Sequence, residues 1–212
     1  SLRYQISTNS AYIIEVLKKR GRMQRHWHKK RIAYVCMLGV FLYLMFRTRS
    51  QNVTFEATVH NSRAADVWEF VADFSNMKKL NPTILDFDIV AERGNFDHWQ
   101  YSAEYTEFLS TFPFIHNFIV SHFSVKPDKG GSYVIESRHS SCFYTRLACL
   151  SSESQFRFYP VETGTRCVEN VTYDCPFLFS SLCYREVMYQ RREIMSNLQK
   201  LLSFPKMETK SM

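Results

Sequence analysis

The chain has 212 residues and a formal net charge of +7, from 27 Lys and Arg residues and 20 Asp and Glu residues. Much of the excess lies in a basic cluster between Lys18 and Arg31, and no basic patch interleaved with aromatic residues follows it, which disfavours a nucleic-acid-binding protein. About 160 residues remain after this region, enough for one domain with a sizeable core and too few for two.

An apolar run from Ile32 to Phe46 follows the basic cluster and predicts a transmembrane anchor over residues 32–47. As a helix the run covers roughly 22 Å, short of the ~30 Å hydrocarbon core, and flanking basic side chains would lengthen it by reaching the headgroups. The same length suits a signal peptide, but Arg47 to Ser50 offers no small-x-small cleavage site. A buried helix of the globular domain is the other alternative.

Basic residues before the apolar run outnumber those after it, which predicts a single-pass protein with a cytosolic amino end. Residues 1–31 then form a basic amino-terminal segment, and the globular part lies in the lumen of the endomembrane system, of the ER type rather than the plasma membrane. The Asn-x-Thr triplets at Asn52 and Asn170 are glycosylation candidates there, one very near the membrane and one inside a predicted strand.

Five cysteines follow the apolar run: Cys142, Cys149, Cys167, Cys175 and Cys183. An oxidising compartment permits one or two disulfides among them with one thiol left over, whereas buried reduced thiols are the alternative, and the connectivity cannot be read from the sequence. No CxxC pair or His at metal-ligand spacing is present, so we expect neither a metal nor a cofactor.

The globular part begins with a strand and two short helices. Apolar and polar residues alternate from Val53 to His60, which is typical of a half-buried strand. Ser62 can cap a helix with apolar spacing up to Phe74. A second helical turn, from Met77 to Leu80, stops before Pro82, because proline disfavours the helical conformation in the residue before it.

A series of antiparallel strands joined by short turns is predicted from Ile84 to Cys175. The alternating segments are Leu85–Ala91, Trp99–Tyr105, Ile115–Val125, Tyr133–His139, Gln155–Val161 and Arg166–Tyr173. The segment from Ser140 to Ser154 shows no clear alternation, because Ser and Cys residues dilute it.

After Pro176 the apolar spacing becomes helical, and one apolar stripe runs from Phe179 to Leu202, with polar residues such as Glu186 and Gln190 assigned to the opposite side. Such a helix needs a broad concave partner to bury its stripe. The predicted fold class is therefore α+β: a curved antiparallel β-sheet wrapped around a long carboxy-terminal helix, preceded by a single transmembrane helix. Residues 204–212 are predicted to form a disordered tail.

This order of elements resembles the helix-grip fold of the START and birch-pollen-allergen-like superfamily, also known as the polyketide cyclase and START-like group. The local match is NSRAADVWEFVADFSNMKKLNP, from Asn61 to Pro82, which is similar to the family's opening helical segment with its Val-Trp pair and Asn-Pro ending. The resemblance covers residues 53–203. It implies a cavity between sheet and long helix that holds an apolar ligand, often a lipid or sterol. The amino-terminal anchor is not a general feature of that superfamily.

Candidates for lining such a cavity are aromatic residues on strands and aliphatic residues on the helix. They are Phe87, Trp99, Tyr101, Tyr105, Phe118, Phe156 and Phe158 from the strands and Val187, Ile194 and Leu198 from the helix. Glu107 and Glu169 share the parity of their strands' apolar faces. Because a buried carboxylate is costly without a partner, either could orient a ligand hydroxyl or pair with an arginine.

Motifs of catalysis are missing from the sequence, which has no GxSxG, no HExxH and no phosphate-binding glycine loop. We therefore expect a membrane-anchored module that binds or transfers a lipid or sterol, with this apolar ligand and the membrane as its partners. A cyclase-type enzyme with His116, His122 or Glu107 as acid or base is one alternative. An interaction module with a filled core is the other.

Overall fold

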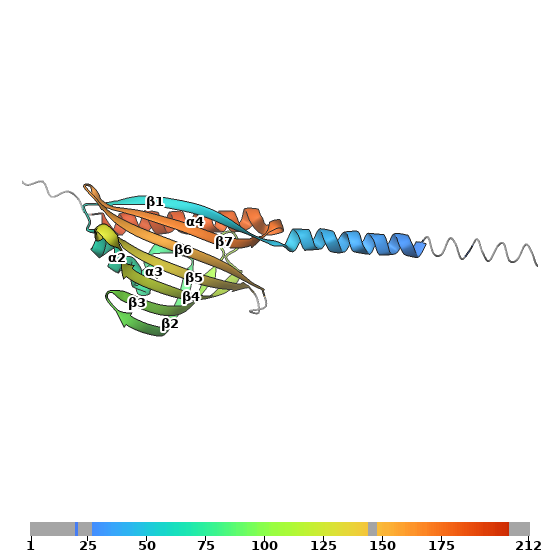
Figure 1. Ribbon diagram of the computed structural model, residues 1–212, viewed down its shortest axis with the longest axis horizontal. Helices are drawn as coiled ribbons and strands as arrows, with labels where there is room; N and C mark the ends of the chain where they lie inside the picture. Colours follow the sequence, from blue (N-terminus) through green and yellow to red (C-terminus); the bar gives the residue numbers. More distant parts are fainter. Residues whose placement is uncertain (1–19, 21–26, 144–147, 204–212) are drawn as a thin grey trace, which may run out of the picture. The chain divides into compact units, whose positions relative to one another are not determined.

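The computed structural model describes residues 20, 27–143 and 148–203, and the chain forms two units, Ser1–Arg47 and Thr48–Met212. The first unit contains a helix over residues 27–46 (Figure 1). Within the described ranges no helix is long and apolar enough to cross a membrane, so the structure does not support the transmembrane helix predicted over residues 32–47. The tail predicted over residues 204–212 and most of the basic segment lie outside the described residues.

The second unit is built on a curved seven-stranded antiparallel sheet (Figure 1). Its strands are β1 (Thr48–His60), β2 (Ile84–Asn95), β3 (His98–Phe108), β4 (His116–Pro127), β5 (Tyr133–Phe143), β6 (Ala148–Val161) and β7 (Gly164–Pro176). Their spatial order is β1-β7-β6-β5-β4-β3-β2, a meander in which the first strand returns to pair with the last. Of the segment between Ser140 and Ser154, which shows no clear alternation, residues 140–143 belong to β5 and residues 148–154 to β6, and the two strands are paired as far as Phe143 and Ala148.

Three helices and two short 3-10 turns complete the unit: α2 (Ala64–Ala72), α3 (Phe74–Leu80), α4 (Ser180–Leu202), η1 (Lys129–Gly131) and η2 (Phe177–Phe179). The predicted cap at Ser62 is wrong, because its hydroxyl donates to the Val59 carbonyl instead. The second helix begins three residues earlier than predicted, since the Asp73 side chain accepts a hydrogen bond from the Ser75 amide and starts a new helix there.

The core lies between the concave face of the sheet and the helices. Side chains alternate in burial along β3 and β4, so that one face packs on the helices and the other faces solvent. From α4 the residues Ile194, Met195 and Leu198 are buried in this core, and the fully buried Phe158 meets them from β6. The predicted α+β fold class, with a curved sheet around a long carboxy-terminal helix, is confirmed.

Two disulfides join elements of the second unit. Cys142–Cys149 links β5 to β6, and Cys175–Cys183 links the end of β7 to the first turns of α4. Cys167 is the thiol left over in this unit, and it is buried. Of the two alternatives that the sequence left open, the structure has the disulfides, two of them, with one thiol left over.

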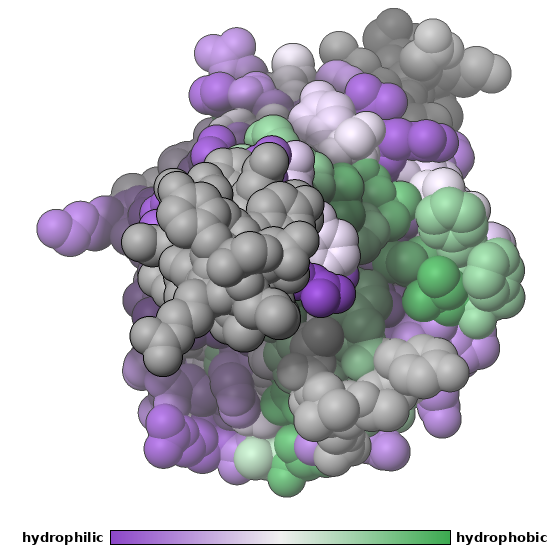
Figure 2. Space-filling model, turned by 90° about the vertical axis from the view of Figure 1, so that its right-hand side faces the viewer, coloured by the Kyte–Doolittle hydropathy of each residue, from purple (hydrophilic) through white to green (hydrophobic). Residues whose placement is uncertain are grey.

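Exposed hydrophobic side chains gather at one end of the sheet. The strand register places the β3–β4 loop, the β7–α4 connection and the start of β1 at the same end. Phe112 and Phe114 of that loop and Phe177 and Leu178 of η2 are exposed there. Green patches of hydrophobic surface among the polar surface are visible in Figure 2. Exposed aromatic clusters of this kind are typical of surfaces that meet a partner or a membrane.

Removal of the second disulfide will lower the stability of the domain. In the double variant Cys175→Ala with Cys183→Ala, we expect the free energy of unfolding to fall by about 2–3 kcal/mol, because the unfolded chain regains the freedom of a short closed loop. Guanidinium unfolding followed by tryptophan fluorescence measures this. Cys36→Ala, in the exposed free cysteine of the first unit, is the control and leaves the transition unchanged. An equal midpoint for all three proteins would contradict the bond's role.

Candidate functional site

An internal cavity of about 90 Å³ lies between the concave face of the sheet and α4. One part of its wall is apolar, with Val71, Phe74 and Met77 from the short helices facing Phe156 and Ile194. The other part is polar and comes from β3, β5, β6, β7 and α4. The cavity is therefore amphiphilic, with hydrogen-bonding groups gathered on one side.

Glu107 is the first charged group of the polar wall. It lies on the inward face of β3 and is only 7% exposed. Its carboxylate accepts hydrogen bonds from Asn81 Nδ2 (2.8 Å) and Gln190 Nε2 (3.2 Å). Burial raises the pKa of Glu107 from 4.5 to about 7, which the nearby Arg191 only partly opposes. The Asn-Pro ending of the opening helical segment thus supplies a direct partner for the buried carboxyl.

A buried ion pair between Glu169 of β7 and Arg191 of α4 is the second feature of the polar wall. Glu169 Oε1 accepts hydrogen bonds from Arg191 Nη1 (3.0 Å) and from the Ser154 hydroxyl (2.6 Å). Glu169 Oε2 and Arg191 Nε are both buried and have no hydrogen-bond partner among the described residues. Unpaired buried polar atoms are costly. A polar group of a ligand could therefore bind to Glu169 Oε2 as acceptor and to Arg191 Nε as donor.

His139 and Tyr105 form the third polar group. The Tyr105 hydroxyl lies 3.1 Å from His139 Nδ1, and His139 Nε2 lies 2.8 Å from the Ser137 hydroxyl. Burial, with Arg191 adding to it, lowers the pKa of His139 to about 3, so its imidazole is neutral at physiological pH. A neutral imidazole has one donor and one acceptor nitrogen and therefore orients a hydroxyl on each side.

Four of the residues predicted to bind ligand line the cavity: Tyr105, Glu107, Phe156 and Ile194. Glu169, singled out for its parity, lines it as well and does pair with an arginine.

Five of the remaining candidates pack into the core without lining the cavity. Phe87 packs against Phe74, the Tyr101 hydroxyl donates to the Ala72 carbonyl, and Phe158 stacks on Phe156. Leu198 is fully buried, and Val187 packs against a smaller cluster around Val171. Trp99, the sixth, lines a separate pocket beside α2. An inward-facing strand position thus identifies the core and does not by itself distinguish the cavity from the packing around it.

Phe118 lies on the other face of the sheet. Its neighbours Asn117 and Ile119 are buried on the concave side, and successive side chains of a strand point to opposite faces. It is paired with Thr106 and Cys142, which also have outward parity. The placement of Phe118 in the cavity was wrong because the predicted segment was apolar on both faces, so alternation could not decide its parity.

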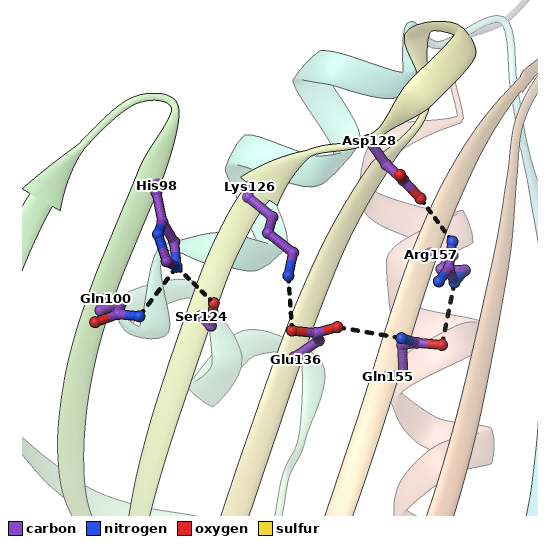
Figure 3. Close-up of polar contacts among 8 residues, drawn as sticks. All are labelled: His98, Gln100, Ser124, Lys126, Asp128, Glu136, Gln155 and Arg157. Carbon is purple, nitrogen blue, oxygen red and sulfur yellow. Dashed lines mark hydrogen bonds and ion pairs between the residues drawn. The ribbon is translucent and has the colours of Figure 1, made fainter.

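The outer face of the sheet carries a polar network across β4, β5 and β6 (Figure 3). Glu136 accepts hydrogen bonds from Lys126 (2.9 Å) and Gln155 (3.3 Å). Arg157 donates to Gln155 (3.1 Å) and to Asp128 (2.6 Å). Because the opposite charges of this network satisfy one another, it stabilises the strand pairing modestly, and we assign it no ligand.

The histidines proposed as acid or base are also outside the cavity. His122 is exposed on the outer face, where Nδ1 lies 2.8 Å from the Ser102 hydroxyl, and His116 is exposed at the start of β4. They share a face, as their parity indicates, but Glu107 points to the opposite one. The structure therefore separates the three groups named for catalysis.

Several cavity residues were missed by the sequence analysis. Gln190 was assigned to the solvent side of α4, yet it binds Glu107, and the neighbouring Glu186 is buried and accepts hydrogen bonds from the amide and hydroxyl of Ser110. His139 shares the parity of Tyr133 and Ile135, a signal that could have placed it inside. Arg191 has no such signal, because helical spacing alone does not show which arginine turns inward.

No family model matches the chain, and no curated protein matches it. Among solved structures, an uncharacterised protein from Rhizobium leguminosarum is similar with a TM-score of 0.52 at 9% identity, covering 73% of this chain and 97% of that one. A conserved protein from Geobacillus kaustophilus gives 0.51 at 11% identity over 73% and 95%. The human StarD13 (DLC2) lipid transfer and protein localization domain gives 0.49 at 14% identity over 74% and 77%. The first two of these likenesses show that the chain shares its fold with those two proteins.

The raised pKa of Glu107 makes the stability of the domain depend on pH. Its neutral form contributes stability that is fully present below about pH 4.5 and is lost as the pH rises through about 7, a change of about 3 kcal/mol. We therefore expect that, between pH 5 and pH 8, the wild-type chain loses about this much stability relative to Glu107→Gln. Urea unfolding across this range measures the difference.

The matched control for this experiment is Glu104→Gln, on the same strand with outward parity. Its stability should follow the wild-type pH curve. Parallel curves for the wild type and Glu107→Gln would show that the carboxyl is ionised in the folded protein.

Proposed function

We propose that the domain binds one amphiphilic small molecule, a lipid or sterol, with its polar group at the Glu169–Arg191 pair and its apolar body along the wall of Phe74, Met77 and Ile194. The observation that carries this proposal is the unpartnered acceptor on Glu169 and donor on Arg191, both buried beside apolar side chains. A ligand hydroxyl or carboxyl satisfies both atoms at once.

The size of the cavity defines how such a ligand is accommodated. At about 90 Å³ it is smaller than the roughly 300–1,000 Å³ of pockets that enclose drug-sized molecules. The polar group of the ligand would fit the cavity in its present size. The apolar part of the ligand would need side chains such as Met77 to change their conformation. Met side chains adapt readily because they are unbranched, with three rotatable bonds.

An enzyme that uses the same cavity is the second candidate function. One observation favours it: a carboxyl with a pKa near 7 exchanges protons readily at physiological pH, and Glu107 faces the cavity. Gln190 and Asn81 hold it in place from two sides. An acid or base of this kind would act on a ligand held at the neighbouring ion pair.

We also propose that the domain faces an oxidising compartment and lies at a membrane, held by the apolar segment over residues 32–47. Two disulfides support the compartment, since such bonds are rare in the cytosol. The exposed aromatic side chains at the end of the sheet where β1 begins support the membrane, as does the basic residue count before the segment. Exchange of the ligand with that bilayer would make the module a transfer protein.

Native mass spectrometry of the full chain from eukaryotic cells, before and after incubation with a lipid extract, tests the ligand. We expect one stoichiometric adduct that carries a hydroxyl or carboxyl. Arg191→Gln should lower its occupancy about tenfold, because a hydrogen-bonding partner is lost. The control Arg192→Gln changes the next residue of α4, which does not line the cavity, and retains the adduct.

The outcomes separate the candidates. A wild-type chain that carries no adduct and takes up no lipid contradicts ligand binding and favours a filled interaction module. Chemical conversion of the bound compound, lost in Glu107→Gln, favours the enzyme.

Glycosylation tests the compartment. The two Asn-x-Thr triplets lie side by side on β1 and β7, where Asn52 is paired with Thr172 and Thr54 with Asn170. We expect an endoglycosidase-sensitive mass on the chain in eukaryotic cells that disappears when Asn52→Gln and Asn170→Gln are combined. Because Asn52 is exposed, we expect it to be the main site. An unmodified chain that protease digests in sealed microsomes would place the domain in the cytosol.

A further inference from the structure

Large apolar side chains are exposed in two segments at the end of the sheet where β1 begins. The β3–β4 loop presents Phe112 and Phe114, and the 3-10 turn η2 presents Phe177 and Leu178; we call this surface the aromatic end. Phe114 is 80% exposed and Leu178 is 52% exposed. Hydrophobic groups are visible on this side of the molecule in Figure 2. The aromatic end is therefore an apolar surface that the domain itself does not cover.

Both segments are attached to the first turns of α4. The turn η2 leads directly into α4 at Ser180. From the loop, the amide and the hydroxyl of Ser110 donate hydrogen bonds to Glu186 Oε2, at 2.9 and 2.7 Å. Because Glu186 is buried, these hydrogen bonds fix the loop to the body of the domain. The exposed side chains of the two segments thus lie around the same end of one helix.

The backbone holds these side chains in exposed positions. The Leu109 amide donates to the Ile115 carbonyl (3.0 Å), and the Ile115 amide donates to the Phe112 carbonyl (2.9 Å). The two phenyl rings of the loop therefore extend from a hydrogen-bonded turn. The disulfide Cys175–Cys183 has the same effect on η2, which lies between its two cysteines.

Positive charge borders the aromatic end. The Arg49 guanidinium lies over the Phe177 ring, 5.2 Å from its centroid. Arg185 lines an open groove of about 610 Å³ between the β3–β4 loop and α4, where the charges of Arg192 and Glu193 offset each other. Within the described part of the chain, Arg49 and Arg185 make no ion pair, so both can bind an anion.

The neighbouring part of the chain indicates what covers the aromatic end. The helix over residues 27–46 exposes large apolar side chains all round, and such a helix needs apolar surroundings. Only Arg47 separates this helix from Thr48, and Thr48 is paired with Pro176, which directly precedes η2. A lipid bilayer around the helix would therefore also reach the aromatic end. It covers both without matching their shapes, as a protein groove would have to.

We propose that the aromatic end inserts into the surface of a phospholipid bilayer, with its apolar side chains among the acyl chains and Arg49 and Arg185 at the lipid phosphates. The inference rests on the membrane location given under the proposed function. It adds which face of the domain meets the lipid and which side chains hold it there.

Quenching of tryptophan fluorescence by brominated acyl chains tests this in phosphatidylcholine vesicles that contain the full chain. Phe114→Trp adds a reporter at the aromatic end, and we expect its emission to shift to shorter wavelength and to be quenched. The matched control Phe96→Trp adds a reporter at an exposed position of the β2–β3 turn, at the opposite end of the sheet, and stays unquenched. Trp27, at the start of the helix over residues 27–46, reports separately on that helix, and Trp27→Phe identifies its share of the signal.

The role of the arginines is tested in the Phe114→Trp chain. Combining Arg49→Gln with Arg185→Gln should lower the ratio of inserted to free aromatic ends about tenfold, because two charged contacts with phosphate are lost. Lys129→Gln removes an exposed positive charge at the opposite end of the sheet and leaves the ratio unchanged.

The outcomes distinguish this inference from the membrane location on which it rests. Quenching of Trp27 without quenching of the reporter in Phe114→Trp overturns the inference and leaves the membrane location standing. Absence of quenching at both positions contradicts the membrane location as well. Equal quenching in Phe114→Trp and Phe96→Trp, or a ratio unaffected by loss of both arginines, overturns the proposed orientation or the phosphate contacts respectively.

Discussion

The burial of charge between the sheet and α4 is the constraint on which the interior of this domain depends. Glu107, Glu169 and Arg191 are held away from water, and the penalty for that is offset only where each finds partners of opposite charge or hydrogen-bonding capacity. Asn81 and Gln190 donate hydrogen bonds to Glu107, and Ser154 donates one to Glu169. These contacts join the end of α3, three strands and α4, so the polar cluster helps to fix the helices on the sheet.

The fold could be predicted because its signals are periodic. Alternation in segments such as Trp99–Tyr105 follows directly from the geometry of strands and is confirmed. The apolar stripe of the long helix is confirmed at Ile194, Met195 and Leu198, whereas Phe179 is exposed and precedes the helix in η2. Prediction failed where local chemistry overrides the pattern. Asp73 starts a helix where a simple continuation was expected, and Ser62 bonds backwards to Val59. The Ser- and Cys-rich strand ends are held by a disulfide and by pairing with neighbours, which no local window shows.

The candidate site was only partly predictable, for a different reason. Parity places Glu107 and Glu169 inside, but it does not separate a side chain that lines a cavity from one that fills the core, as Tyr101 and Phe158 show. From the sequence alone, the polar residues of α4 form a face that is expected to be exposed to solvent. Only the structure shows that a buried carboxylate lies opposite some of them. Gln190 is an example, because its position is explained by Glu107 on a strand more than eighty residues away.

The Cys175–Cys183 bond has a mechanical consequence for α4. It ties the first turns of the helix covalently to the end of β7, while Gln199 near the other end donates to the Thr58 carbonyl of β1 (3.0 Å). A helix fastened at both ends to the sheet cannot swing outward as a lid. The short helix α3, whose Met77 borders the cavity, is held by the hydrogen bond from Asn197 to the Leu80 carbonyl (3.0 Å), by Asn81 and by its buried Phe74. The disulfide therefore holds the α4 side of the cavity wall, which carries Gln190, Arg191 and Ile194, in a fixed position against the end of β7.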